Sequence, residues 1–166
     1  MGTEDKIVLM DEMVAIRQRL AEQGKRVVFT NGVFDILHRG HAEYLAAAQQ
    51  LGDVLILGLN GDDSVRRLKG EARPLVPVED RAYLLASLAA VDYVVVFDSD
   101  TPRDLIAALK PDILVKGGDY RPEDIVGRDT VEADGGSVVT IPLTPQRSTT
   151  NIIQKIMTLT RQGRLS

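Results

Sequence analysis

Residues 27–41 of the chain read VVFTNGVFDILHRGH, and this stretch holds both histidines of the sequence. Its first three residues are apolar, which is typical of a short strand buried on both faces. A turn with Gly32 and Gly40 follows, and we expect a helix to begin near His41. His38 and His41 would then lie where a strand ends and a helix starts, beside free backbone N–H groups that attract anions.

Outside this stretch, short aliphatic runs alternate with segments that repeat apolar residues at helical spacing. Aliphatic runs joined to helices by short connections predict parallel strands with right-handed crossovers. The expected fold is therefore α/β: a Rossmann-like, doubly wound, mostly parallel five-stranded sheet with helices on both faces. Ligands of such a sheet gather at the carboxyl ends of its strands. The predicted strands are residues 27–29, 54–57, 93–97, 113–115 and 138–141.

A single domain accounts for the pattern, because no linker, low-complexity tract or internal repeat interrupts it. Apolar residues at helical spacing stop at Gly24, which predicts a helix over about residues 10–23. We expect that helix to pack on a core of about residues 25–160. Residues 1–166 would then form one domain.

Capping residues indicate two further helix starts. Thr101 followed by Pro102 predicts an N-cap and a first-turn proline. Ser148 precedes an amphipathic segment that includes Ile152 and Ile153, so it is expected to begin a C-terminal helix. The sequence leaves open whether that helix covers the sheet or makes a contact in a homo-oligomer.

The composition is that of an ordinary globular chain and excludes several classes of protein. The 166 residues are 44% hydrophobic and 27% charged and include no cysteine, which excludes disulfides, thiol nucleophiles and iron–sulfur clusters. No run approaches the roughly 20 apolar residues of a membrane span, and no secretory signal is recognisable, so we expect a cytoplasmic protein without a membrane partner. The net charge of −4 disfavours nucleic acid as a partner but allows a local basic pocket for a small anion.

The spacing of the two histidines suits a role in phosphate chemistry. An imidazole donates from one ring nitrogen when neutral and from both when protonated, which would stabilise charge on a phosphate during its transfer. Two other interpretations stay open. His38, His41 and Asp35 could ligate a divalent ion, although no third histidine or cysteine supports such a site. Both rings could also be satisfied by local hydrogen bonds at a helix start.

Four ordered motifs extend from this stretch across most of the chain. They are His38-x-Gly40-His41 with the upstream Asn31-Gly32-x-Phe34-Asp35, then Arg67-Leu68-Lys69-Gly70 with Arg73-Pro74, then Lys116-Gly117-Gly118-Asp119-Tyr120, and finally Ser148-Thr149-Thr150-Asn151-Ile152-Ile153. Together they resemble the HxGH nucleotidyltransferases, which are cytidylyltransferase-like α/β enzymes. Within that family they are most similar to the adenylyltransferases that make ADP-activated heptose for lipopolysaccharide cores.

The resemblance implies transfer of AMP from ATP to a sugar 1-phosphate, with release of pyrophosphate. The implied acceptor is D-glycero-β-D-manno-heptose 1-phosphate, and the product would be ADP-heptose. Because related enzymes often carry a sugar kinase ahead of this part, a separate sugar kinase is expected to supply the acceptor. Mg²⁺ is expected to arrive with the phosphates of ATP, without a ligand from a protein side chain.

The resemblance also implies roles for individual residues. Catalysis would depend on His38, His41 and Lys69. The acceptor phosphate or sugar would contact Asp35, Arg73 and Arg147. Related sequences commonly have a small or uncharged residue at the last of these positions. The nucleotide would contact Thr30, Asn31, Gly32, Phe34, Gly40, Lys116, Gly118, Asp119, Ser148, Thr149 and Thr150.

Other functions and other roles stay open at this point. A glycerol 3-phosphate or ethanolamine phosphate cytidylyltransferase would use the same histidines and the same in-line chemistry. A nucleotide-sensing module would bind ATP without catalysis. Asp119 fits a helix cap as well as a ribose contact, Lys69 and Arg73 fit a solvated basic loop, and Arg81 fits the surface of a helix. Residues 60–64 are explained by a turn and a capped helix.

Overall fold

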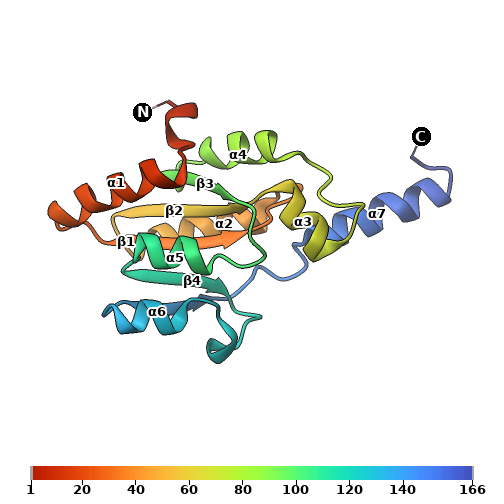
Figure 1. Ribbon diagram of the computed structural model, residues 1–166. Helices are drawn as coiled ribbons and strands as arrows, with labels where there is room; N and C mark the ends of the chain where they lie inside the picture. Colours follow the sequence, from red (N-terminus) through yellow and green to blue (C-terminus); the bar gives the residue numbers. More distant parts are fainter. Residues whose placement is uncertain (1, 166) are drawn as a thin grey trace.

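The computed structural model describes residues 2–165 and contains a sheet of five strands with helices on both faces (Figure 1). All strand pairs are parallel, and the order is β3-β2-β1-β4-β5, so β1 lies at the centre. The predicted fold class is confirmed. The strands are β1 Val27–Gly32, β2 Val54–Asn60, β3 Tyr93–Phe97, β4 Ile113–Gly117 and β5 Ser137–Ile141.

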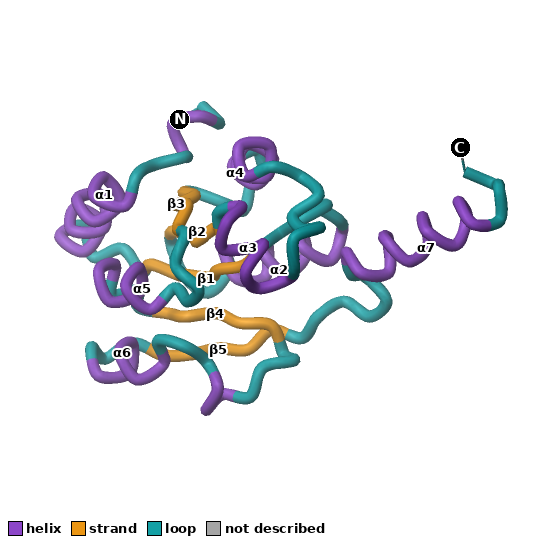
Figure 2. Tube along the Cα trace, turned by 45° about the vertical axis from the view of Figure 1, so that its right-hand side comes forward, coloured by secondary structure: helices purple, strands orange, loops and turns teal. Residues whose placement is uncertain are grey.

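The helices bury the sheet from both sides. Side chains of α2 and α4 form one apolar cluster with the sheet, and side chains of α1, α5 and α6 form the other. Figure 2 shows α1, α5 and α6 together on one side of the sheet. The helices are η1 Glu4–Lys6, α1 Met10–Glu22, α2 Arg39–Gln49, α3 Asp62–Lys69, α4 Val78–Ala86, α5 Arg103–Leu109, η2 Pro122–Asp124, α6 Arg128–Ala133 and α7 Thr149–Arg161.

Side chains along each central strand alternate between the two clusters. In β4, Leu114 packs in the cluster with α5, whereas Val115 packs in the cluster with α2. In β1, Phe29 packs on the α5 side as well. Because successive residues of a strand point to opposite faces, Asn31 and Lys116 lie on the α5 side at the carboxyl ends of their strands.

The predicted N-terminal helix is α1, and it packs on α5. Met13 is fully buried between the helix and the sheet. The Arg17 guanidinium donates to the carbonyl oxygens of Leu109 and Lys110, at 3.0 and 2.9 Å, where α5 ends. These bonds satisfy carbonyl groups that the end of a helix leaves without partners.

The helix starts were predicted with mixed success. Ser148 is the N-cap of α7, and its hydroxyl accepts from the Asn151 N–H at 3.1 Å, as expected. The prediction of Thr101 as the cap of α5 is wrong, because the Pro102 carbonyl oxygen accepts the first helical bond, from the Ile106 N–H at 2.9 Å, and Pro102 is therefore the N-cap.

Helix α7 extends away from the sheet in both views (Figures 1 and 2), and none of its residues is buried. The interpretation in which it covers the sheet is therefore wrong, while a role in a homo-oligomer stays a prediction. Ile156 and Met157 are about half exposed, at 45% and 46%. Among the helices of residues 2–165, none has the length and apolar character that a membrane span requires.

Candidate active site

A cleft of about 600 Å³ lies at the carboxyl ends of β1 and β4. This volume is within the range of small-molecule sites. The cleft brings together nearly every residue that the sequence predicts for the site, from segments far apart in the chain. The predicted residues that line it are Asn31, Gly32, Phe34, Asp35, His38, Gly40, His41, Lys69, Arg73, Lys116, Asp119, Arg147, Ser148, Thr149 and Thr150.

Thr30 and Gly118 are the predicted residues that do not line the cleft. Thr30 is completely buried, and its hydroxyl donates to the Val115 carbonyl oxygen at 3.1 Å and contacts the Tyr44 hydroxyl at 2.8 Å. A direct contact between Thr30 and a nucleotide is therefore wrong for this geometry. The Gly118 N–H donates to the Ile141 carbonyl oxygen at 2.8 Å, which joins the loop after β4 to β5.

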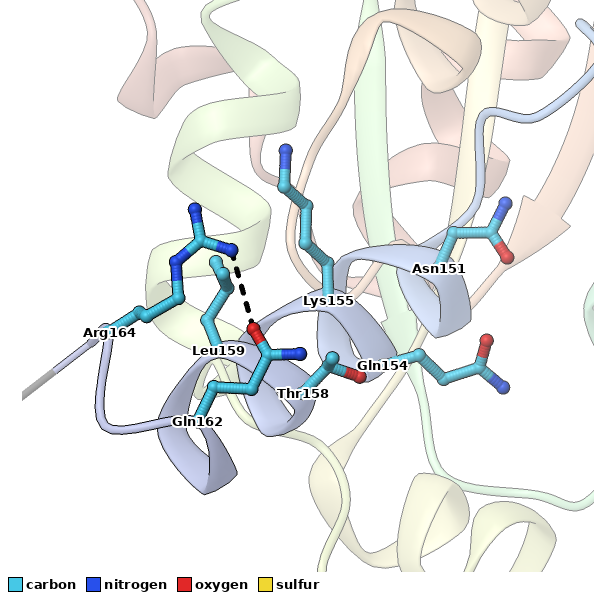
Figure 3. A pocket seen from close by; sticks show the side chains of 7 residues that line it. All are labelled: Asn151, Gln154, Lys155, Thr158, Leu159, Gln162 and Arg164. Carbon is cyan, nitrogen blue, oxygen red and sulfur yellow. Dashed lines mark hydrogen bonds between the residues drawn. The ribbon is translucent and has the colours of Figure 1, made fainter.

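A second depression, of about 440 Å³, lies along α7 (Figure 3). The Arg164 guanidinium donates to the Gln162 side-chain oxygen there, at 3.3 Å. This surface contains none of the residues predicted for the site, so the larger cleft is the candidate active site. The depression is lined by Asn151, Gln154, Lys155, Thr158, Leu159, Gln162 and Arg164.

The two histidines stack on each other at the start of α2. Their ring centroids are 3.8 Å apart with an angle of 20° between the planes, and the rings of Phe34 and His41 meet edge to face with centroids 5.2 Å apart. His38 is the N-cap, and its backbone N–H donates to His41 Nδ1 at 3.4 Å. Because Nδ1 accepts, the proton of a neutral His41 lies on Nε2.

Both imidazoles favour the neutral form. Burial, together with the charge of a protonated His38, lowers the pKa of His41 to about 4. Burial and then the Arg147 guanidinium lower the pKa of His38 below its ordinary value. Within residues 2–165, the buried Nδ1 atom of His38 has no hydrogen-bond partner. At neutral pH the pair therefore offers neutral N–H donors at a helix start rather than two positive charges.

The turn that carries the histidines is tightly packed and strained. Phe34 and Ile36 both have φ of +49°, which lies in the left-handed region of backbone conformation. This conformation is strained for residues other than glycine, and most of all for a β-branched residue such as Ile36. A Cβ on Gly40 would lie 2.9 Å from the Arg147 Cβ and 3.1 Å from the His38 ring, so only glycine allows this approach. The turn therefore places His38 next to Arg147, a residue that lies just before α7.

Asp35 holds the loop between α3 and α4 in place. Its side chain is fully buried, and it accepts from the Arg73 guanidinium at 2.7 Å and from the N–H groups of Leu75 and Val76 at 2.8 and 2.9 Å. Burial alone would raise the pKa of Asp35, but the two N–H groups and Arg73 outweigh it, so the pKa is lowered. Asp35 and Arg73 are thus paired with each other, and their contact with an acceptor stays a prediction.

Arg81 is a buried residue beside the cleft whose position the sequence interpretation missed. It is 1% exposed, so its assignment to the surface of a helix is wrong. Its guanidinium donates to the carbonyl oxygens of Val33, Asn60 and Val76 at 2.7 to 2.9 Å and to the Asp62 carboxylate at 2.6 Å. Arg81 therefore joins the histidine turn, the end of β2 and the loop before α4. Its spacing of four from the buried Leu85 is the signal that places it on the inner face of α4.

The N-terminus of α7 forms the wall of the cleft next to the histidines. The Thr149 hydroxyl donates to the Asp35 carbonyl oxygen at 2.6 Å, which ties this helix end to the histidine turn. The first N–H groups of a helix lack partners within it, and the helix dipole adds positive potential there. Together with the exposed Arg147, this end is suited to bind phosphate groups.

The floor of the cleft is formed by Asn31 and Lys116. The Lys116 ammonium donates to the Asn31 side-chain oxygen and lies 5.7 Å from the centre of the Tyr120 ring. Burial lowers the pKa of Lys116 to about 8, although the charge of Asp119 opposes this effect. The sequence interpretation did not single out Tyr44, whose buried hydroxyl has its pKa raised to about 12, or Leu143, which also lines the cleft.

The donor set of the cleft fits an anion rather than a bare metal ion. Among residues 2–165, no three side chains of histidine, cysteine, aspartate or glutamate gather as they would around a metal. Asp35 in particular is occupied by Arg73 and two backbone N–H groups. Imidazole, ammonium, guanidinium and hydroxyl groups can donate hydrogen bonds to phosphate oxygens. A Mg²⁺ ion that is bound to phosphates keeps several waters and needs few protein ligands.

Comparisons with known proteins agree with this geometry. The chain matches the cytidylyltransferase-like family over residues 29–155. The bifunctional protein HldE of Syntrophotalea carbinolica is 55% identical over 160 residues, which are 96% of this chain and 33% of that protein. The bifunctional protein HldE of Geobacter sulfurreducens is 55% identical over 152 residues, or 92% of this chain and 31% of that protein. The chain thus spans about a third of the length of these relatives.

Solved structures give the same fold. A lipopolysaccharide core biosynthesis protein from Thermoplasma volcanium is 29% identical, with a TM-score of 0.60 over 73% of this chain and 98% of that chain. A pantoate-beta-alanine ligase from Francisella tularensis, at 16% identity and a TM-score of 0.58 over 94% of this chain and 79% of that chain, shares the fold alone. Because the family match covers most of the sequence and includes the histidine turn and the start of α7, the chain belongs to the cytidylyltransferase-like family.

Proposed function

We propose that this chain transfers AMP from ATP to D-glycero-β-D-manno-heptose 1-phosphate and releases pyrophosphate. The observation that carries the proposal is the stacked pair His38 and His41 at the start of α2, in one cleft with the N-terminus of α7. The resemblance to heptose 1-phosphate adenylyltransferases supports the choice of substrates. So do the identity of 55% with a bifunctional HldE protein and the likeness to a lipopolysaccharide core biosynthesis protein.

The reaction is a direct displacement at phosphorus. An oxygen of the acceptor phosphate attacks the α-phosphorus of ATP, and the bond from that phosphorus to the oxygen bridging to the β-phosphate breaks. Pyrophosphate leaves with the bonding electrons, and ADP-heptose forms. The second pKa of a phosphate monoester is about 6, so the attacking group is already a dianion at neutral pH and needs no general base.

The protein's task is to gather the phosphates and to stabilise the charge that develops between them. We assign the Nε2–H of His41 to the α-phosphoryl oxygens, because it is the donor that the bond to Nδ1 leaves free. Arg147 and the first N–H groups of α7 receive the leaving pyrophosphate, and Lys69, at the end of α3, adds a further positive charge to the same cleft. Mg²⁺ bound to the phosphates of ATP supplies further neutralising charge.

The proposal extends to the setting of the reaction. We propose that residues 1–166 work as one nucleotidyltransferase domain in the cytoplasm. A sugar kinase, fused or separate, makes the acceptor. A kinase is the class of enzyme that the acceptor requires, because its phosphate must be placed on a sugar hydroxyl before adenylylation.

A pyrophosphate-release assay tests the proposal. ATP, CTP and GTP are each combined with heptose 1-phosphate and with glycerol 3-phosphate in the presence of Mg²⁺. We expect turnover with ATP and heptose 1-phosphate, and at least tenfold lower kcat/KM for the other combinations. A preference for CTP with glycerol 3-phosphate would replace the proposal with a cytidylyltransferase. Binding of ATP without turnover on any sugar phosphate would indicate a sensing module.

A further inference from the structure

Lys116 is a buried cation at the floor of the cleft. Its residue is 8% exposed, and its ammonium donates to the side-chain oxygen of Asn31. Among residues 2–165, no carboxylate lies within 4 Å of it, whereas Arg73 and Arg81 each form an ion pair. A buried charge without a counter-ion destabilises a fold by several kcal/mol unless something else compensates it. The cleft that Lys116 lines is where a compensating anion can enter.

We infer that Lys116 binds the phosphate of the acceptor, on the side of the reacting phosphorus opposite to the leaving pyrophosphate. This inference deepens the proposed function and rests on it. It also revises the role that the sequence suggested for Lys116, from a contact with the nucleotide to a contact with the second substrate.

The two faces of the sheet supply the geometric argument. The histidines belong to α2, which packs on one face, whereas the alternation along β4 places Lys116 on the face that packs against α5. In-line displacement requires the attacking and leaving oxygens on opposite sides of the phosphorus. A triphosphate bound by the histidine turn and α7 leaves the α5 side of the cleft for the attacking phosphate.

The polar groups near the histidines form a set of their own. Arg147 contacts the histidine turn through Gly40, and Thr149 is bonded to the carbonyl of Asp35, so these groups form one connected set. Lys116 belongs to another set, with Asn31 and Tyr120. Two separate groups of donors match a reaction that brings two separate phosphates together.

The surroundings of Lys116 suit a sugar attached to that phosphate. Asp119 and Asp124 follow in the loop after β4, and Thr101 lines the cleft just before α5. Carboxylates accept hydrogen bonds from the hydroxyl groups of a sugar, and a threonine hydroxyl can donate or accept one. Tyr120 is 50% exposed and offers an aromatic face to the sugar ring.

The test compares wild type with Lys116→Met, which removes the charge and keeps most of the length of the side chain. Losing a charged hydrogen-bond partner of a substrate typically weakens binding about tenfold to hundredfold. We expect the KM for heptose 1-phosphate to rise by about that factor, while the dissociation constant of a non-hydrolysable ATP analogue, measured by calorimetry, stays within about twofold. The matched control is Lys155→Met on the exposed side of α7 (Figure 3), which should change neither value.

Each outcome decides the question. A weaker affinity for the ATP analogue with an unchanged acceptor KM would place Lys116 on the nucleotide and overturn the inference, and so would two unchanged values. If wild type turns over ATP and heptose 1-phosphate, the proposed function stands whatever the variant does. If wild type binds the ATP analogue but no heptose 1-phosphate in calorimetry, the proposed function and the inference both fall.

Two further measurements exclude a merely structural role. Removing an uncompensated buried charge should leave the thermal midpoint of Lys116→Met at or above that of wild type, so misfolding would not explain a high KM. The pKa of Lys116 near 8, with Asp119 and Tyr120 as the ionisable neighbours in its loop, also gives a pH signature. The wild-type kcat/KM for the acceptor should fall above about pH 8, and this fall should be absent in Lys116→Met. The same alkaline fall in both proteins would contradict the inference.

Discussion

Two sets of polar groups at the cleft differ in how completely the fold pairs them. In the first set, Asp35 accepts three hydrogen bonds, and the buried Arg81 donates four, one of them to Asp62. In the second set, Lys116 has a single amide oxygen as its partner, and the Nδ1 atom of His38 has none within residues 2–165. The first set is complete without a ligand, and the second is not.

This difference separates residues that stabilise the fold from residues that act on a substrate. A fully paired buried charge contributes stability only while every partner is in place, so its loss should destabilise the fold. An incompletely paired group already costs stability in the free protein, so its loss should impair function and leave the fold intact. Substitutions in each set test this difference.

The largest loss of stability is expected from Arg81→Met. It leaves three carbonyl oxygens and the Asp62 carboxylate without their partner, which typically costs about 3–5 kcal/mol of the free energy of unfolding. Urea denaturation measures this value. The control is Arg103→Met, which breaks an exposed ion pair with Asp129 and should cost less than about 1 kcal/mol. Equal losses in the two variants would remove the distinction between paired and exposed charges.

The next largest effect is expected from His41→Asn, and it should appear in kcat. The asparagine oxygen can still accept from the His38 N–H, as Nδ1 does, while the donor at Nε2 is lost. Removing one preorganised donor of this kind typically lowers kcat about a hundredfold to a thousandfold. The free energy of unfolding should stay within about 1 kcal/mol of wild type, by analogy with surface and cleft substitutions away from the core. Unchanged turnover would exclude His41 from the reaction.

The smallest effect is expected from Asp35→Asn, and it should depend on pH. The substitution keeps the shape but removes a charge that accepts from Arg73, which typically costs about 1–3 kcal/mol at neutral pH. The pKa of Asp35 is lowered from its ordinary value of 3.8, so its carboxylate stabilises the folded state above about pH 4. That contribution is lost as the pH falls through the lowered value. Urea denaturation between pH 7 and pH 3 should therefore show wild type approaching the variant, and a constant difference would contradict this account.

The sheet was predictable because parallel strands buried on both faces leave unbroken aliphatic runs in the sequence. All five predicted runs lie in strands, and the histidine pair lies at a helix start, as its place after the first run indicated. The order of the strands was not predictable by periodicity, since register and neighbours depend on the packing of the helices. The position of α7 was left open by the sequence, because an amphipathic pattern shows that a face is apolar but not what covers it.

The sequence motifs predicted the residues of the site better than the chemical type of each single residue did. Lys69, Arg147 and the hydroxyls at the start of α7 were expected from their motifs, and the structure brings them to the cleft of the histidines. Thr30 was misplaced because the predicted strand ended at Phe29, whereas β1 continues to Gly32 and directs the Thr30 hydroxyl into the buried interior. Arg81 was missed because charged residues are rarely buried. Its burial is explained by the four hydrogen bonds that its guanidinium donates.

The contact between the two imidazoles makes them a single titrating unit. Their centroids are 3.8 Å apart, so a proton on one ring repels a proton on the other. Two such coupled groups lose their protons in two steps, and the apparent pKa of each step is a property of the pair rather than of one residue. Ring signals of His38 and His41 in a magnetic resonance titration should therefore each record both steps, and the unit should carry no more than one positive charge at the pH of the cell.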